Sequence, residues 1–433
     1  MTRVRLLPRT AYRLWPIVLP LALMLASDYK LRSRSDDQAI GGKPDLMILA
    51  EIGVYAAAAL FLYLRFGMRP PTRRRTGLLL LAWCWTGYAA MSALWSPFPT
   101  LGVVRGAQLL ITMAVVHVLA TRATTTELRR MAHAFVAVVV GSVVIGAVHP
   151  FPRTHLTLDR FNWLYVHPVI AGVYLGLAVL LVVGFLVRHG VIGWSGRDGK
   201  SWSPAVYLLA LAVLSGALVA TGTRGAALGC AAGLLVLMAT ANGPRGRADL
   251  VVLGFSVAAL AVFAFSDQIL AFIQRGESAE KLSSLNSRTD LWSLALDAFR
   301  QQPIFGHGMG AARGLFLAET GLGGGHNAFV NALVDEGVVG TALFLGLLLT
   351  LTVVLCSLLR SQRTRADAGT LLAMMAFFVT DGITTEGLAT SANVSGIWLL
   401  LVVAWTETLR RRNPPPPLPG TLVPQTAGAS WKP

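Results

Sequence analysis

Charged residues are scarce in this chain of 433 residues, making up 13% of it against 54% for hydrophobic residues. Soluble domains carry about 25% charged residues, so this composition excludes a set of ordinary soluble domains. Cysteine is scarcer still, with three in the whole chain. Cys84, Cys230 and Cys356 fall inside apolar runs without any CxxC pair, which excludes a disulfide framework and predicts three small core residues.

What the chain has instead is a series of apolar runs separated by short polar stretches. A run of about 20 residues crosses the hydrocarbon layer of a bilayer. The sequence therefore predicts an all-α polytopic membrane protein with about twelve transmembrane helices. The first run follows a basic N-terminus, so a signal peptide cleaved near Ala26-Ser27 is the alternative there. The predicted spans lie near residues 14 to 26, 46 to 64, 78 to 95, 101 to 120, 131 to 148, 167 to 187, 205 to 221, 225 to 240, 250 to 265, 338 to 358, 366 to 381 and 391 to 409.

The distribution of Lys and Arg predicts the orientation of these spans. A net charge of +16 would suggest nucleic acid as a partner of a soluble chain, but here the position of the charges matters more. With the N-terminus in the cytoplasm, the segments on that side carry 24 of the 37 basic residues, as the positive-inside rule requires. Both termini are then cytoplasmic. Arg73-Arg74-Arg75 and Arg410-Arg411-Arg412 are interpreted as anchors, and the Pro-rich segment 410 to 433 as a disordered tail.

One predicted external segment is much longer than the others. It runs from residue 266 to residue 337, between nine helices in residues 1 to 265 and three helices in residues 338 to 409. Loops of this length in compact folds usually carry function. We therefore expect the working face of the protein to be the external one.

Within this large loop, a basic residue opens an amphipathic helix. Ser287 and Asp290 have the spacing of a capping box, and Gln301-Gln302-Pro303 ends the helical pattern. The simplest interpretation is a helix lying on the membrane surface. That interpretation leaves Arg288 in the first turn unexplained, because the helix dipole disfavours a cation there, whereas free backbone N–H groups and an arginine together favour an anion. Phosphate binding is therefore favoured over a solvated charge.

A second arginine is predicted on the same face of the membrane. Arg224 belongs to Thr221-Gly222-Thr223-Arg224-Gly225, the tight turn between the seventh and eighth spans. Alone, it would be interpreted as a side chain that snorkels toward lipid headgroups. Since Arg288 lies on the same side, the two guanidinium groups become candidates for one ligand, and they match a diphosphate well.

The third feature is a histidine in Gly323-Gly324-Gly325-His326-Asn327, just before a helical pattern from Ala328 to Leu358. The last 21 residues of that pattern are apolar, so its first turns should project above the membrane or line a cavity. Asn327, Asn331 and Asp335 would then share one polar face. A histidine at a helix start is often a cap, whereas flexible glycines before it favour a positioned base. The residues alone leave these two interpretations even.

Together, these residues resemble the O-antigen ligase and polymerase superfamily, whose members have many spans and one large periplasmic loop in the C-terminal half. Its ligases are recognised by His-Asn/Ser/Gln, nine residues, then Gly-x-x-Gly/Thr/Tyr. Here His326-Asn327 is followed, after nine residues, by Gly337-Val338-Val339-Gly340. The arginine turn, the loop helix and the order of the spans also agree, so the resemblance covers most of the chain.

The resemblance implies a GT-C-like fold and a metal-independent, inverting glycosyltransferase of lipopolysaccharide biosynthesis in the bacterial inner membrane. Such a ligase moves a polysaccharide from undecaprenyl diphosphate to a sugar hydroxyl of the lipid A core at the periplasmic face. No cofactor or nucleic acid is implied, and membrane lipids are the other partners. Arg224 and Arg288 would stabilise the leaving diphosphate, and His326 would take the proton of the attacking hydroxyl.

Secondary candidates lie near the predicted external ends of the spans. The basic candidates would contact phosphate or core sugar, but they are equally well explained as interfacial anchors. Asp381 or Glu386 would orient His326 or a sugar hydroxyl, and the alternative is that the acid only caps a helix. His307, in the Gly306-His307-Gly308 turn, is assigned no chemistry. The secondary candidates are Arg105, Arg160, His167, Asn327 and Asp381.

Two rival functions stay open. The first is the same chemistry with another acceptor, as in an O-antigen polymerase or a protein O-oligosaccharyltransferase, which share the architecture of the ligases. The second is a flippase for lipid-linked oligosaccharide. Transporters place polar groups at mid-membrane and often contain repeated halves, whereas the candidate residues of this chain collect at one face.

Overall fold

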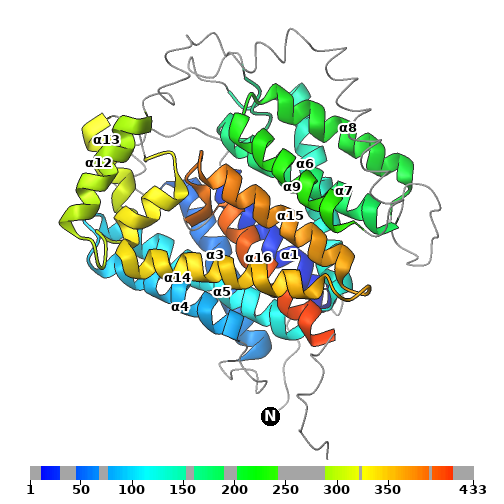
Figure 1. The fold of residues 1–433 in the computed structure, drawn as a ribbon, viewed down its shortest axis with the longest axis horizontal. Helices are drawn as coiled ribbons and strands as arrows, with labels where there is room; N and C mark the ends of the chain where they lie inside the picture. The colour runs from blue at the N-terminus through cyan, green and yellow to red at the C-terminus, as the bar shows by residue number, and fades with distance from the viewer. Residues whose placement is uncertain are drawn as a thin grey trace, which may run out of the picture.

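The computed structural model describes residues 11–29, 45–67, 77–152, 160–189, 202–241, 288–320, 324–389 and 393–412. Within these ranges the chain is all-helical and contains no β-strand (Figure 1). Helices occupy eleven of the predicted span positions, and the ninth position, near 250 to 265, lies outside the described residues. The eleven helices are α1 (Ala11–Asp28), α3 (Leu46–Phe66), α4 (Gly77–Met91), α5 (Pro99–Arg122), α6 (Thr125–Val148), α7 (Pro168–His189), α8 (Pro204–Ala220), α9 (Arg224–Thr240), α14 (Ala328–Leu358), α15 (Arg365–Gly382) and α16 (Val394–Arg412).

Six of the described helices are long and apolar enough to cross a membrane: α3, α4 with the short helix η1 (Ser92–Leu94), α5, α6, α7 and α14. Helices α1, α8 and α9 are apolar but shorter. These helices agree with a polytopic membrane protein, while the count of twelve spans stays a prediction. Helices α15 and α16 carry more charged residues, among them Asp367, Asp381 and Glu407, and all three side chains are buried within the bundle.

Local sequence signals set several helix starts. The Asp45 side chain accepts the backbone N–H groups of the first turn of α3, at 3.0 and 3.1 Å. Thr124 and Glu127 form a capping box at the start of α6. Pro204 follows Ser203, the N-cap of α8. These are the residue types that satisfy otherwise unpaired N–H groups at a helix start, so the boundaries follow from ordinary capping chemistry.

Contacts between helix termini show that the helices alternate in direction. Asp28, at the end of α1, accepts the backbone N–H of Val394, at the start of α16, at 2.8 Å. Thr223, just before α9, donates to the backbone oxygen of Pro168, at the start of α7, at 3.0 Å. We call this end of the bundle, where α7, α9 and α16 begin and α1 ends, the site end.

The other end of the bundle is held by arginines. Arg129, near the start of α6, pairs with Asp367, near the start of α15, at 2.6 Å, and Arg188, near the end of α7, pairs with the same carboxylate at 3.2 Å. Arg411 donates to the backbone oxygens of Thr121 and Ala123, both at 2.8 Å. Helix α16 continues through Arg412, so residues 410 to 412 are helical and not part of a disordered tail as predicted. Residues 413 to 433 lie outside the described part of the chain.

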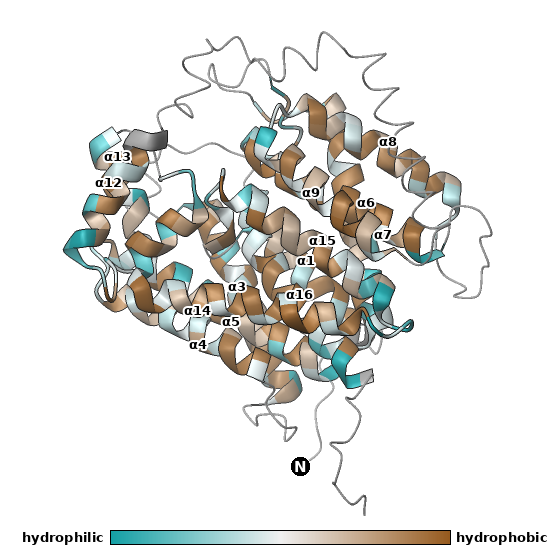
Figure 2. Ribbon diagram, viewed as in Figure 1, coloured by the Kyte–Doolittle hydropathy of each residue, from teal (hydrophilic) through white to brown (hydrophobic). Residues whose placement is uncertain are grey.

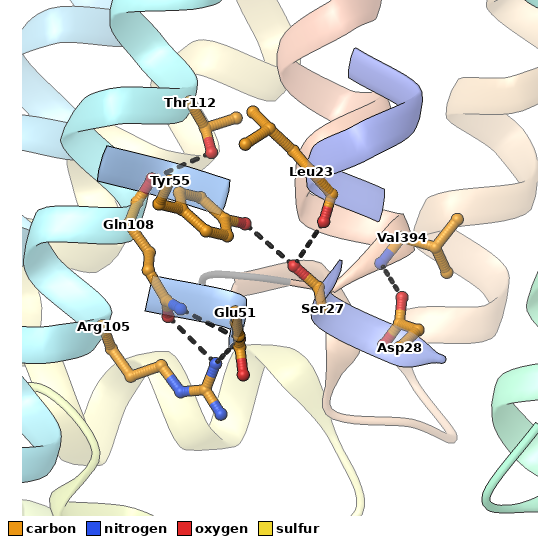
Figure 3. A network of polar contacts seen from close by, with 9 residues as sticks. All are labelled: Leu23, Ser27, Asp28, Glu51, Tyr55, Arg105, Gln108, Thr112 and Val394. Carbon is orange, nitrogen blue, oxygen red and sulfur yellow. Dashed lines mark hydrogen bonds and ion pairs between the residues drawn. The ribbon is translucent and has the colours of Figure 1, made fainter. Parts of the chain in front are cut away.

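The first helix is tied into the bundle by buried hydrogen bonds (Figure 3). Ser27 donates to the backbone oxygen of Leu23 at 2.7 Å, and its hydroxyl lies 2.8 Å from that of Tyr55 on α3. Tyr174 of α7 donates to Asp28 at 3.0 Å. Ser27 and Asp28, beside the possible cleavage site, thus bond to residues of α3, α7 and α16.

Two shorter helices, α12 (Arg288–Gln301) and α13 (Ala311–Thr320), lie together beside the first turns of α14 (Figure 1). Helix α12 ends at Gln301, as the sequence predicts, whereas the sequence predicts no bounds for α13. The apolar face of α12 packs on α13 and α14, and its position relative to the membrane surface stays a prediction. The small core between the three helices consists of Leu291, Ala295, Ala312, Phe316 and Val334.

Helix α14 covers Ala328–Leu358, the range that the sequence predicts, but it bends at Gly337. The backbone there has φ 62° and ψ −164°, a conformation that only glycine adopts readily. A Cβ at Gly337 would also lie 2.5 Å from the backbone nitrogen of Gly306. The bend separates the polar first turns of α14 from its apolar remainder. Hydrophilic residues gather around α12, while hydrophobic residues line the long helices (Figure 2).

The cysteines correct one expectation. All three are free, and Cys230 is buried as predicted, but Cys84 and Cys356 are exposed on the outside of the bundle. An apolar run in a membrane protein has a face toward lipid as well as a face toward protein, so membership of such a run does not imply burial.

Candidate active site

The loop before α14 holds His326 in an uncommon backbone conformation. Its φ is +48°, in the left-handed region that non-glycine residues seldom adopt, although histidine does so more often than most. The backbone N–H of Gly325 donates to the Asn331 side chain at 3.1 Å, and Trp292 of α12 donates to the Gly325 oxygen at 3.2 Å. Because α14 and α12 hold the loop from two sides, the position of His326 is fixed by tertiary contacts rather than by the flexible glycines.

A carboxylate lies against the same loop. Glu386, between α15 and the short helix η4 (Gly387–Ala389), accepts the backbone N–H of His326 at 3.2 Å, and the same Oε1 atom lies 3.6 Å from Nδ1 of the imidazole. The carboxylate occupies the space that a Cβ at Gly324 would need. The His326 side chain is 45% exposed and that of Glu386 27% exposed, so the ring stays accessible while one nitrogen faces an acid.

A second histidine lies within electrostatic reach. The pKa of His167, in the loop before α7, is lowered to about 4, first by desolvation, then by the positive charge of Arg160 and then by His326. His167 is therefore neutral at pH 7. This coupling brings two of the predicted secondary residues, Arg160 and His167, into the neighbourhood of His326.

Arg160 is bound to the turn that precedes α9. Its Nε donates to the backbone oxygen of Thr221 at 2.8 Å, and a terminal nitrogen donates to the Thr223 hydroxyl at 3.1 Å. Gly222 has φ 59°, which lets the chain reverse between α8 and α9 as the sequence predicts. Arg224 is the first residue of α9 and is half-buried. The turn therefore carries one arginine of its own and binds a second.

The arginine turn and His326 lie on two sides of the chain that leaves α15. Gly225, next to Arg224, packs so closely on Thr384 that a Cβ there would overlap the threonine side chain. Thr384 is two residues before Glu386, which contacts His326. The short segment after α15 thus links the two halves of the candidate site.

Asp381, the other acid of this region, occupies a different place. It is 2% exposed and accepts a hydrogen bond from the Thr385 hydroxyl at 2.7 Å. Its second oxygen, Oδ1, points toward the start of α9, 3.2 Å from where a Cβ of Gly225 would lie. The described contacts therefore place Asp381 beside the arginine turn rather than beside His326.

Arg288 is the first residue of α12, which agrees with its predicted place in the first turn of a helix. Its side chain lies outside the described part of the structure. The joint use of Arg288 and Arg224 for one diphosphate consequently stays a prediction.

Arg105 lies in a network of its own (Figure 3). It pairs with Glu51 of α3 at 3.3 Å and donates to Gln108 at 3.0 Å, while Gln108 donates to Glu51 at 2.9 Å. The Glu51 side chain is 4% exposed, and an isolated carboxylate so deeply buried would be costly. Among the contacts described, Arg105 balances this buried charge.

The side chains on the predicted polar face of α14 bind backbone groups of the protein. Asn327 is the N-cap of the helix, and Asn331 binds Gly325. Asp335 accepts the backbone N–H groups of Gly310 at 3.2 Å and Ala312 at 2.6 Å. These side chains anchor the loop and α13, which explains the face without any ligand.

His307 has only structural contacts among those described. Its backbone N–H donates to the Val334 oxygen at 2.8 Å, and its Nε2 lies 2.8 Å from the Ala298 oxygen. As for metals, no group of three or more His, Cys, Asp and Glu side chains in the described ranges is arranged to hold an ion. Metal-free chemistry stays a prediction.

Residues 209–345 match the O-antigen ligase family. The resemblance to the O-antigen ligase family is confirmed. The matched stretch begins within α8 and ends within α14, so it contains the arginine turn, the start of α12 and the His326 loop. It also contains the whole of the ligase motif, from His326 to Gly340.

A curated relative extends this likeness. The exopolysaccharide production protein ExoQ of Rhizobium meliloti (strain 1021) is 26% identical over 382 residues, which cover 82% of this chain and 83% of ExoQ. The similarity therefore reaches beyond the stretch that matches the O-antigen ligase family. Both comparisons connect this multi-span membrane protein with the assembly of bacterial polysaccharides.

Proposed function

We propose that this protein is an O-antigen ligase that transfers polysaccharide from undecaprenyl diphosphate to a sugar hydroxyl of the lipid A core. The observation that carries the proposal is the environment of His326. A half-exposed imidazole beside a carboxylate lies at the same bundle end as the Arg160 and Arg224 turn, within the stretch that matches the ligase family. A base near basic groups is what displacement of a diphosphate requires.

The proposed reaction is one direct displacement at the anomeric carbon. The acceptor hydroxyl loses its proton to His326 while its oxygen bonds to the anomeric carbon. The bond between that carbon and the diphosphate oxygen breaks, and the diphosphate leaves on its lipid. One displacement inverts the configuration of the anomeric carbon.

Arginines would stabilise the leaving group. Negative charge grows on the diphosphate as the bond breaks, and guanidinium groups bind phosphate oxygens through two parallel hydrogen bonds. Arg224, at the start of α9, and Arg288, at the start of α12, are the proposed pair. Arg160 and His167 are proposed secondary contacts, since both lie near His326 and the arginine turn.

The place of the site in the membrane is part of the proposal. Both substrates are anchored to lipids, so the site must open beside the bilayer. The charge distribution favours cytoplasmic termini, which puts the site end at the periplasmic face of the inner membrane. The segment 266 to 337 would then be the large periplasmic loop.

A second candidate is a polymerase that adds glycan to glycan. It is favoured by the similarity to ExoQ, whose name refers to exopolysaccharide production rather than to ligation to a lipid. The donor, the base and the leaving group would be the same, and the acceptor hydroxyl would belong to another lipid-linked glycan.

A reconstituted assay with two acceptors separates these functions. Purified protein would receive undecaprenyl-diphosphate polysaccharide together with lipid A core, or with a second lipid-linked glycan. We expect a product in which the polysaccharide is joined to the core. Deletion of the gene should leave bare core and an accumulation of lipid-linked polymer. Extension of the glycan, with core carrying one repeat unit after deletion, would establish the polymerase instead. Movement of the donor across liposomes without a covalent product would overturn both.

A further inference from the structure

We infer that Glu386 is the positioning residue of His326: its carboxylate orients the imidazole so that Nε2 faces the acceptor hydroxyl. This inference rests on the proposed function, since it concerns the same base. The sequence left two acids as candidates for this role, and the geometry separates them.

Glu386 contacts both the backbone and the ring of His326. One oxygen, Oε1, accepts the backbone N–H at 3.2 Å and lies 3.6 Å from Nδ1, which is ion-pair distance and slightly longer than a hydrogen bond. Catalytic hydrogen bonds are often long without substrate and shorten in the complex. The backbone contact also stabilises the left-handed conformation of His326, which is strained in a non-glycine residue.

The loop is built around this carboxylate. Gly324, with φ +152°, leaves open the space that the Glu386 carboxylate fills, and any Cβ at position 324 would displace it. Gly325 is held by Asn331 and Trp292, so the loop cannot shift without breaking those bonds. Gly324 therefore has a steric explanation, which is the close approach of an acid from the segment after α15.

The contact selects the useful tautomer of the histidine. With Nδ1–H directed at the carboxylate, the lone pair of Nε2 is available to take a proton. When His326 receives the proton of the acceptor hydroxyl, the imidazolium forms next to a negative charge. Glu386 keeps its charge and receives no proton, so it acts through His326 rather than on the substrate.

Asp381 is excluded from this role by its position. It is buried, bonded to Thr385 and directed at the start of α9. Other titratable groups near the pair come from different elements: His167 and Arg160 from the connection before α7, and Asp335 from α14, which is electrostatically coupled to Glu386. Removing Glu386 leaves these groups in place.

The test compares Glu386→Gln and Glu386→Asp with Glu319→Gln, a matched change at an exposed glutamate of α13. Loss of a hydrogen bond to a charged group should lower kcat of Glu386→Gln about 10- to 100-fold. Donor KM should stay within about twofold, because the diphosphate contacts are intact. The acid limb of the rate profile should move to lower pH, since the imidazolium has lost its counter-charge. Aspartate should restore part of kcat and of the acid limb.

Histidine NMR on the purified protein gives a readout that does not depend on turnover. Signals of ¹⁵N-labelled His326, assigned with His326→Gln, should show a proton on Nδ1 in wild type, and the titration should move to lower pH in Glu386→Gln. An unchanged tautomer and titration would overturn the inference even if the wild type transfers glycan normally. Absence of transfer in the wild type, with these NMR shifts present, would instead count against the proposed function.

Discussion

Two glycine-rich turns in the same region of the chain each carry a histidine, and the structure uses them differently. His307 lies between Gly306 and Gly308 and bonds to backbone oxygens of Ala298 and Val334. His326 follows Gly324 and Gly325, is half-exposed, and faces a carboxylate. The local sequences of the two turns are similar. The partner that the fold supplies therefore distinguishes the structural histidine from the candidate base.

Replacing His326 should have the largest effect on function. His326→Ala removes the general base and should reduce the transfer rate by about 10² to 10⁴, while the protein still inserts and folds, because a half-exposed ring contributes little packing. Rates would be measured on purified protein after its elution profile has been matched to wild type. Near-normal turnover would remove His326 from the mechanism and erase the contrast with His307.

The arginine substitutions should come next. Arg224→Lys and Arg288→Lys keep the charge but lose the fork that binds two phosphate oxygens, so each should lower kcat/KM about 10- to 100-fold, the value of a hydrogen bond to a charged group. Arg300→Lys is the control, since Arg300 is exposed on α12 and pairs with Asp297. Full activity of both lysine variants would show that general electrostatic attraction is enough.

His307 should show the opposite behaviour to His326. His307→Ala breaks a side-chain bond that holds α12, with a cost of about 0.5 to 1.5 kcal/mol, so the midpoint of thermal unfolding should fall. The rate per folded molecule should stay close to wild type. A large loss of rate with an unchanged unfolding midpoint would mean that His307 belongs to the active site after all.

On stability, His167 should have the smallest effect, and only in acid. Its folded pKa of about 4 lies below the unfolded value of about 6.5, so between these values the unfolded chain binds a proton that the folded chain does not. Stability should therefore fall as the pH drops from about 6.5 toward 4. His167→Asn should make this fall in stability shallower and should leave the pH dependence of stability unchanged above pH 7. Unfolding midpoints of both proteins at pH 7.5 and pH 5 would reveal the difference. An equal slope in both proteins would contradict the lowered pKa.

Most of the fold follows from the sequence because membrane helices need long apolar runs with polar interruptions. The range Ala328–Leu358 and the end of α12 at Gln301 both follow from hydrophobic periodicity and helix-stop residues. Helix α13 does not, since ten residues give too short a pattern, and its stability comes from packing on α12 and α14. The outward position of Cys84 likewise depends on which face of α4 meets lipid.

The candidate site was only partly predictable. Arg224 and His326 stand next to turn glycines, a local signal that a sequence can show. The contact of His326 with Glu386 joins residues 60 positions apart and depends on how α15 packs against α9 through Gly225. Asp381 and Glu386 are five residues apart and look alike in the sequence, yet the turn after α15 directs them to different neighbours. Side-chain partners of this kind are set by tertiary packing.

Transfer by purified protein in nanodiscs is the most direct test of the proposed chemistry. The protein would receive undecaprenyl-diphosphate polysaccharide and lipid A core, with and without EDTA, and the new glycosidic bond would be examined by NMR. We predict a joined product with inverted anomeric configuration, formed at the same rate in both conditions. A retained configuration, or a rate that is lost in EDTA and restored by magnesium or manganese, would contradict a direct, metal-free displacement.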